Sequence, residues 1–233
     1  MNRWTSLLLK AVMFVLVVAI LATVTAITRY ALFDDKLKAP RTEAERTLFL
    51  AVEAVKANPN DAIARIKLAA AYLEVNQVNK AMGEAKIATR LAPKNPEAFY
   101  ILGIVNREKG NAVQAAQNLE KAAKLPGQLA PFYQACWSEL ANIYMGQKKY
   151  SQAIRAYDSA LGYGPEAATL LYDLARAYEL SKDTTSAIGY YKEVLEFLPD
   201  HTGALESLKR LEKETAAKNK NNSTAPATST AGK

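Results

Sequence analysis

The side chains in this chain that could do chemistry are few. Among 233 residues there is one cysteine, Cys136, and one histidine, His201. A lone cysteine cannot close a disulfide within the chain, and neither residue has the Cys or His neighbours that a metal site needs. Gly162 and Gly164 lie just before Pro165 without the pattern of a phosphate-binding loop. The sequence therefore predicts no enzyme, no cofactor and no metal site, and places function in binding surfaces.

The elements that carry such surfaces follow a 34-residue repeat between Asp61 and Pro199. Apolar residues recur within it at three- and four-residue spacings, which is the period of a helix. The clearest copy reads Trp137-x2-Leu140-Ala141-x2-Tyr144, then Ala153-x3-Tyr157, Ala160 and Pro165. The next copy has, at matching positions, Leu171, Leu174, Ala175, Tyr178, Ala187, Tyr191 and Pro199.

This pattern resembles the tetratricopeptide repeat, a helix–turn–helix unit of that period. The resemblance implies an all-α fold, a right-handed solenoid of antiparallel helix pairs. Small residues are expected where the two helices of a pair cross, because larger side chains would push the axes beyond ~8–10 Å. These residues are Ala69, Gly103, Ala141 and Ala175 in the first helices, and Ala81, Ala115, Ala153 and Ala187 in the second.

The predicted organisation has four parts. They are an N-terminal transmembrane anchor at 1–33, a linker at 34–41, the solenoid at 42–217 and a disordered polar tail at 218–233. The solenoid comprises a starting helix at 42–57, repeats at about 62–95, 96–129, 134–167 and 168–201, and a capping helix at 202–217. The second repeat departs from the pattern, because Asn106 replaces the expected tyrosine and extra residues lengthen the loop at 125–131.

An uncharged run at residues 11–27, AVMFVLVVAILATVTAI, predicts a retained membrane-spanning helix over residues 5–32. The alternative is a signal peptide cleaved after Val24-Thr25-Ala26, which would leave a soluble exported or periplasmic repeat protein. The Lys and Arg counts beside the run favour cytoplasmic repeats. Short N-terminal tails ahead of a signal-like segment usually stay inside, however. We therefore expect a single-pass membrane protein whose repeats lie on the extracytoplasmic, periplasmic side. A cytoplasmic location of the repeats is the alternative.

The formal net charge of +7 does not point to nucleic acid. Residues 42–217 carry equal numbers of acidic and basic side chains, so the excess comes from the two ends of the chain. Within the repeats, residues 62–126 are more basic and residues 127–200 more acidic. This asymmetry is interpreted either as scatter on solvated helix faces or as a groove that orients a partner.

In this family the first helices line the concave face, so their residues that do not pack between helices are candidates for partner contact. They are Ile66, Ala70, Leu73, Tyr100, Ile104, Arg107, Ser138, Asn142, Met145, Tyr172, Arg176 and Glu179. Such a set suits an extended peptide segment or an amphipathic helix of a protein partner. Alternatively, the starting helix covers the first three. A Lys/Asn/Arg clamp for a carboxylate is excluded, because its positions hold Ile66, Ala70, Ile101, Ala135 and Glu139 or, one repeat later, Tyr100, Ile104, Glu139, Thr169 and Asp173.

Resemblance to bacterial membrane-anchored repeat proteins implies a scaffold or adaptor. Such a protein would hold a partner in its concave groove and support assembly of a membrane or envelope complex. Tyr100, Tyr172 and Arg176 are expected to contribute most to binding, because tyrosine and arginine dominate protein interfaces. The alternative is a constitutive structural subunit of a membrane complex, with contacts through its outer face and loops.

Overall fold

A computed structural model describes residue 13 and residues 16–25, 42–164 and 167–223. The chain divides into two units, Met1–Phe49 and Leu50–Lys233, and the boundary falls within α2 (Glu43–Ala57). In the first unit, residues 16–25 are helical and their side chains are exposed. The second unit contains the repeats.

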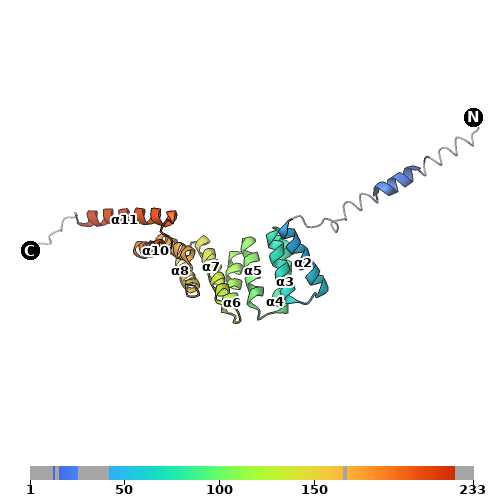
Figure 1. The fold of residues 1–233 in the computed structure, drawn as a ribbon, viewed down its shortest axis with the longest axis horizontal. Coiled ribbons are helices and arrows are strands. Elements are labelled where there is room, and N and C mark those ends of the chain that lie inside the picture. Colours follow the sequence, from blue (N-terminus) through green and yellow to red (C-terminus); the bar gives the residue numbers. More distant parts are fainter. Residues whose placement is uncertain (1–12, 14–15, 26–41, 165–166, 224–233) are drawn as a thin grey trace, which may run out of the picture. The chain divides into compact units, whose positions relative to one another are not determined.

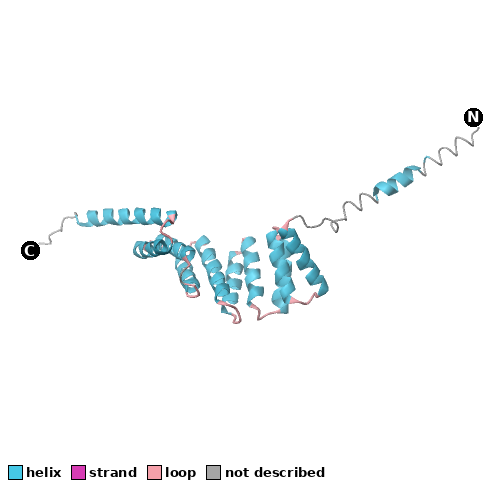
Figure 2. Ribbon diagram, in the orientation of Figure 1, coloured by secondary structure: helices cyan, strands magenta, loops and turns pink. Residues whose placement is uncertain are grey.

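In the described part of the second unit, four antiparallel helix pairs and a final helix follow the end of α2 (Figure 1). Every helix packs against the next along the chain from α3 to α11, and α3 also contacts α5. The parts of the chain that the structure describes are helices and loops, without strands (Figure 2). The pairs are α3 (Ala62–Glu74) with α4 (Val78–Leu91), α5 (Pro96–Glu108) with α6 (Ala112–Lys124), α7 (Ala130–Gly146) with α8 (Tyr150–Leu161), and α9 (Ala168–Leu180) with α10 (Thr184–Phe197); α11 is Thr202–Ser223.

The turn inside each pair has the same backbone geometry. Asn76, Gly110, Lys148 and Lys182 all have positive φ, between 56° and 75°. The following amide then donates back across the helix end, as from Gln77 N to Tyr72 O at 2.7 Å and from Lys149 N to Tyr144 O at 2.9 Å. This bond pairs a carbonyl that the helix end would otherwise leave unsatisfied. The repeat is therefore visible in backbone conformation as well as in side chains.

The small residues predicted at the helix crossings are all buried. The seven alanines have no exposed surface, and a Cβ added to Gly103 would come 2.7 Å from Leu119 Cγ on α6. The buried rings of Tyr157 and Tyr191 fill the space between neighbouring helices. These observations confirm the all-α solenoid of helix pairs.

The lengthened loop between α6 and α7 is held by polar contacts. Tyr133 Oη donates to Leu125 O at 2.9 Å and accepts from Gln128 N at 3.2 Å. Tyr133 also stacks on Tyr163, with ring centroids 5.3 Å apart. Leu129 projects from this loop and is 79% exposed.

Two predictions at the ends of the chain have different outcomes. The predicted tail at 218–233 is wrong at its start, because α11 continues to Ser223. Its sequence has no proline or glycine from residue 204 to residue 223, so nothing in it ends the helix earlier. The predicted membrane helix at 5–32 lies largely outside the described residues. Among the helices that the structure does describe, none combines the length and apolar character needed to cross a membrane.

Cys136 lies in the core of the repeats, and His201 lies at the start of the last helix. Cys136 is fully buried beside Phe99, Ala122 and Ala123, and burial raises the pKa of its thiol to about 12. A thiol with that pKa is a poor nucleophile at neutral pH. His201 Nδ1 accepts a hydrogen bond from Ala204 N at 3.1 Å, and so caps the start of α11. In the described part of the chain, no cluster of three or more metal-ligating side chains occurs.

Candidate partner-binding face

The twelve predicted contact residues occupy one side of α3, α5, α7 and α9, three in each helix. Within each helix they follow the i, i+4, i+7 spacing, which puts them on one face. We call this surface the first-helix face. Only Asn142 and Arg176 are exposed, Ile66 is buried, and the other nine are partly buried. The face therefore consists largely of side chains that also take part in packing.

The α3 end of this face is apolar and mostly enclosed. Ile66 belongs to a core cluster that includes residues of α4 and α5, and it is 9% exposed. Ala70 and Leu73 pack against the same cluster. Ile66 is thus unavailable for partner contact, because the neighbouring helix pairs cover it.

Polar pairing begins between α5 and α7. Arg107 forms an ion pair with Glu139 on α7 and another with Glu108 at 2.8 Å. Tyr100 packs beside Phe132 at the start of α7, with ring centroids 5.4 Å apart. Burial raises the pKa of the Tyr100 hydroxyl, and the charge of Glu139 adds to this. The middle of the face therefore has a paired carboxylate next to a half-buried tyrosine.

Asn142 and Asp173 lie at the boundary between α7 and α9. The buried Tyr157 donates from its hydroxyl to Asn142 Oδ1 at 2.6 Å. Burial raises the pKa of Tyr157, and the charge of Asp173 contributes to the increase. Asp173 itself has a 26% exposed side chain and pairs with Arg176 at 3.6 Å. This region offers oxygen acceptors to a ligand.

The α9 end of the face is occupied by α10 and α11. Glu179 accepts from Tyr191 Oη and from Arg210 Nη2, each at 2.9 Å. Tyr172 lies against Tyr191 and His201, with ring centroids 5.7 Å and 4.6 Å away. Tyr172 and Glu179 therefore both contact the helices that end the solenoid.

The comparisons with known proteins agree with this geometry. A family model described as tetratricopeptide repeat matches residues 66–132 and 138–202, more than half of the chain. This chain is a tetratricopeptide-repeat protein. The four matched helix pairs include every residue of the first-helix face.

Solved structures share the repeat fold. A crystal structure of MamA protein is 25% identical, with a TM-score of 0.57 over 64% of this chain and 80% of that one. A Pseudomonas aeruginosa structure, pilF, is 19% identical, with a TM-score of 0.64 over 77% and 80%. A curated relative from Schizosaccharomyces pombe, an N-terminal acetyltransferase A complex subunit-like protein, is 26% identical over 102 residues. The match covers 44% of this chain and only 14% of that relative.

Sequence reasoning missed several residues that shape the face of this repeat protein. Glu139 and Asp173 are 34 residues apart, at the same position in the third and fourth repeats, yet they served only to exclude a carboxylate clamp. Their equivalent positions were the signal that could have identified two acidic sites. The involvement of Tyr157 and Arg210 had no comparable signal, because it depends on how neighbouring helices rotate.

Proposed function

We propose that this repeat protein is a membrane-anchored scaffold or adaptor that binds a partner protein on its first-helix face. It would support the assembly of a membrane or envelope complex, and we propose no catalytic role. The repeat fold supports a protein partner. The observation that carries the site is the concentration of exposed or half-buried polar groups on α7 and α9. Asn142, Asp173 and Arg176 lie there beside tyrosine rings.

A site-specific cross-linking experiment tests this function. A photoreactive amino acid at Asn142, which is exposed on α7, is expected to give a discrete cross-linked species in intact cells. The same group at Lys86, exposed on the second helix α4, serves as the matched control and should give none. Labelling from Lys86 but not from Asn142 would contradict binding at the first-helix face.

A structural-subunit role is the second candidate, and the α6–α7 loop favours it. Leu129 is 79% exposed there, and Tyr163 beside the loop is 42% exposed. Apolar side chains of this size on a surface mark contact sites when they gather together. A photoreactive group at Leu129 that gives one product at fixed stoichiometry would support this role over recruitment of clients.

The membrane part of the proposal has its own test. We expect residues 5–32 to be retained as a single span, with the repeats on the extracytoplasmic side, because residues 11–27 are uncharged and apolar. Intact-mass measurement of the mature protein should then include the N-terminal segment. A mature chain that begins at Ile27 would instead indicate a cleaved signal and an exported soluble protein.

A further inference from the structure

Three carboxylates of α7 and α9 belong to or border the first-helix face, and two of them are paired with arginines from other helices. Glu139 on α7 pairs with Arg107 from α5. Glu179 on α9 pairs with Arg210 from α11 at 2.9 Å and also accepts from Tyr191. In both places the chain neutralises a carboxylate of this surface with a guanidinium from a different helix. Arginine suits the role because its planar fork matches a carboxylate.

Asp173 is the third carboxylate, and its pairing is different. Its partner among the described residues is Arg176, three residues along the same helix, and their charged atoms are 3.6 Å apart. Arg176 is 50% exposed and also lies over the Tyr172 ring, 5.9 Å from its centroid. Burial raises the pKa of Asp173 although Arg176 opposes the change. The charge of Asp173 is therefore only partly compensated within the chain.

The groups around Asp173 can accept hydrogen bonds from a cation. Asn142 is exposed, and Tyr157 fixes the orientation of its amide by donating to Oδ1 at 2.6 Å. Asp173 lies close enough to the Tyr157 hydroxyl for its charge to add to the increase that burial causes in the pKa of that group, so this hydroxyl lies near both Asn142 and Asp173. A guanidinium placed here would find a partly desolvated carboxylate near the exposed amide of Asn142.

We propose that Asp173 receives an arginine side chain from an extended segment of the partner protein, with Asn142 lining the same subsite. The inference rests on the proposed function, since it specifies what the first-helix face recognises. The incoming arginine would complete at Asp173 the cross-helix pairing that Arg107 and Arg210 already make at Glu139 and Glu179. Charge complementarity selects this occupant, because residues 127–200 are acidic on balance.

The test uses the full chain in detergent micelles and a displayed library of random peptides. Wild-type protein should enrich peptides that contain arginine. A selected peptide is then synthesised with arginine, lysine or the uncharged isostere citrulline, and its affinity is measured by fluorescence anisotropy. Asp173→Asn should weaken the arginine peptide about tenfold or more, because a charge-assisted hydrogen bond is lost. The citrulline peptide should be equally weak with both proteins.

Two further variants give the test its controls. Asp158→Asn removes a carboxylate on the second helix α8 whose pKa burial also raises, and it should leave binding unchanged. Arg176→Gln should tighten the arginine peptide, because it removes the internal competitor for Asp173. The sequence alone leads to the opposite expectation, because it predicts that Arg176 strengthens partner binding. Circular dichroism on each variant separates a binding change from a loss of fold.

The outcomes distinguish this inference from the proposed function. Enriched peptides without basic residues, or an arginine peptide that binds Asp173→Asn as well as wild type, would overturn the subsite while leaving peptide binding intact. Equal binding of the lysine and arginine peptides would overturn the choice of guanidinium. Failure to enrich any peptide, together with no cross-link from Asn142, would overturn the proposed function itself.

Discussion

Ala153→Arg is expected to unfold the third repeat. Ala153 on α8 has no exposed surface and belongs to the core cluster that contains Leu140, Tyr157 and Leu174. An arginine there would overpack the crossing of α7 and α8 and bury a charge without a partner. Changes of that kind exceed ~4 kcal/mol, which corresponds to a fall in thermal midpoint of roughly 8 °C or more for a unit of this size.

The matched control for Ala153→Arg is Ser151→Arg on the same helix. Ser151 is exposed, so the same side chain should remain solvated and change the thermal midpoint little. Circular dichroism melts compare the two variants, and amide hydrogen exchange locates the effect. Equal midpoints for Ala153→Arg and wild type would mean that α8 does not pack through this residue.

The positions of the helix crossings could be predicted from the sequence because packing there tolerates little variation. Only a small side chain fits where two axes approach closely, so residues such as Ala153 and Gly103 recur at the repeat period. Gly103 illustrates the constraint, since even one added carbon would come 2.7 Å from Leu119 Cγ. A spacing rule of this kind leaves a direct trace in the order of residue types.

The polar contacts on the first-helix face leave no such trace. The pairing of Arg107 with Glu139 depends on the rotation between two helix pairs, across a connection that contains the lengthened loop. Arg210 reaches Glu179 from the final helix, which lies outside the repeat pattern. Sequence reasoning placed Arg107 and Glu179 on the correct helices but could not show that both are already paired.

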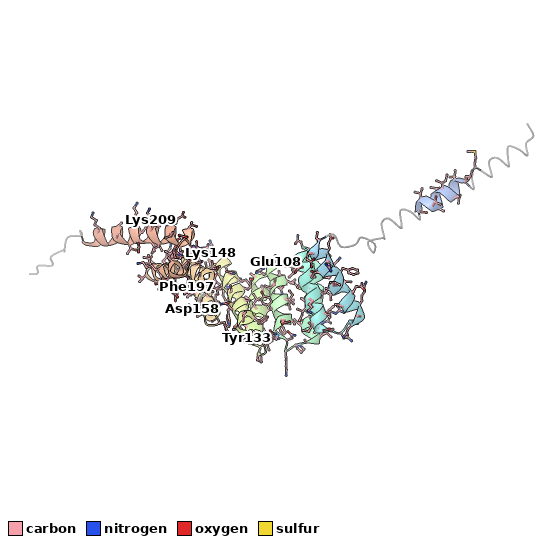
Figure 3. The ribbon with its side chains drawn as sticks, in the orientation of Figure 1. Glu108, Tyr133, Lys148, Asp158, Phe197 and Lys209 are labelled. Atoms are coloured by element: carbon pink, nitrogen blue, oxygen red, sulfur yellow. The ribbon has the colours of Figure 1, made fainter. Side chains whose placement is uncertain are left out.

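The conformation of the turn residues is also difficult to predict from residue type. Gly146 is the glycine of the turn region in the third repeat, but it ends α7, and the positive φ belongs to Lys148. The equivalent residue in the second repeat is Gly110, which takes this conformation easily. The repeat register therefore determines the backbone conformation even where the residue type does not favour it (Figure 3 labels Lys148).

Tyr172→Ala is expected to loosen α11 from the rest of the solenoid. Besides its contacts with Tyr191 and His201, the Tyr172 hydroxyl lies close to the first turn of α11, where a Cβ on Gly203 would come 2.6 Å away. Truncation to alanine removes all of these contacts and leaves a cavity between α9 and α11. A loss of about 2–4 kcal/mol follows from the range for large-to-small core changes.

Amide hydrogen exchange measures this effect helix by helix. Amides near Ala204 should exchange faster in Tyr172→Ala, because His201 loses the ring that holds it as the cap of α11. Amides of α3–α6 should be unaffected, since repeat units depend mainly on their neighbours. Tyr172→Phe keeps the ring and should exchange like wild type. Unchanged protection of α11 in Tyr172→Ala would show that Tyr172 does not support the helix.

This result decides how Tyr172 should be used as a probe of binding. The sequence predicts that alanine at Tyr100, Tyr172 and Arg176 abolishes partner capture without disturbing the fold. Because Tyr172 also supports α11, a loss of capture in that variant would combine a changed surface with a loosened helix. Tyr172→Phe separates the two effects, since it removes only the hydroxyl and keeps the ring against Tyr191 and His201. A partner that depends on Tyr172 itself should bind Tyr172→Phe more weakly while α11 keeps its protection.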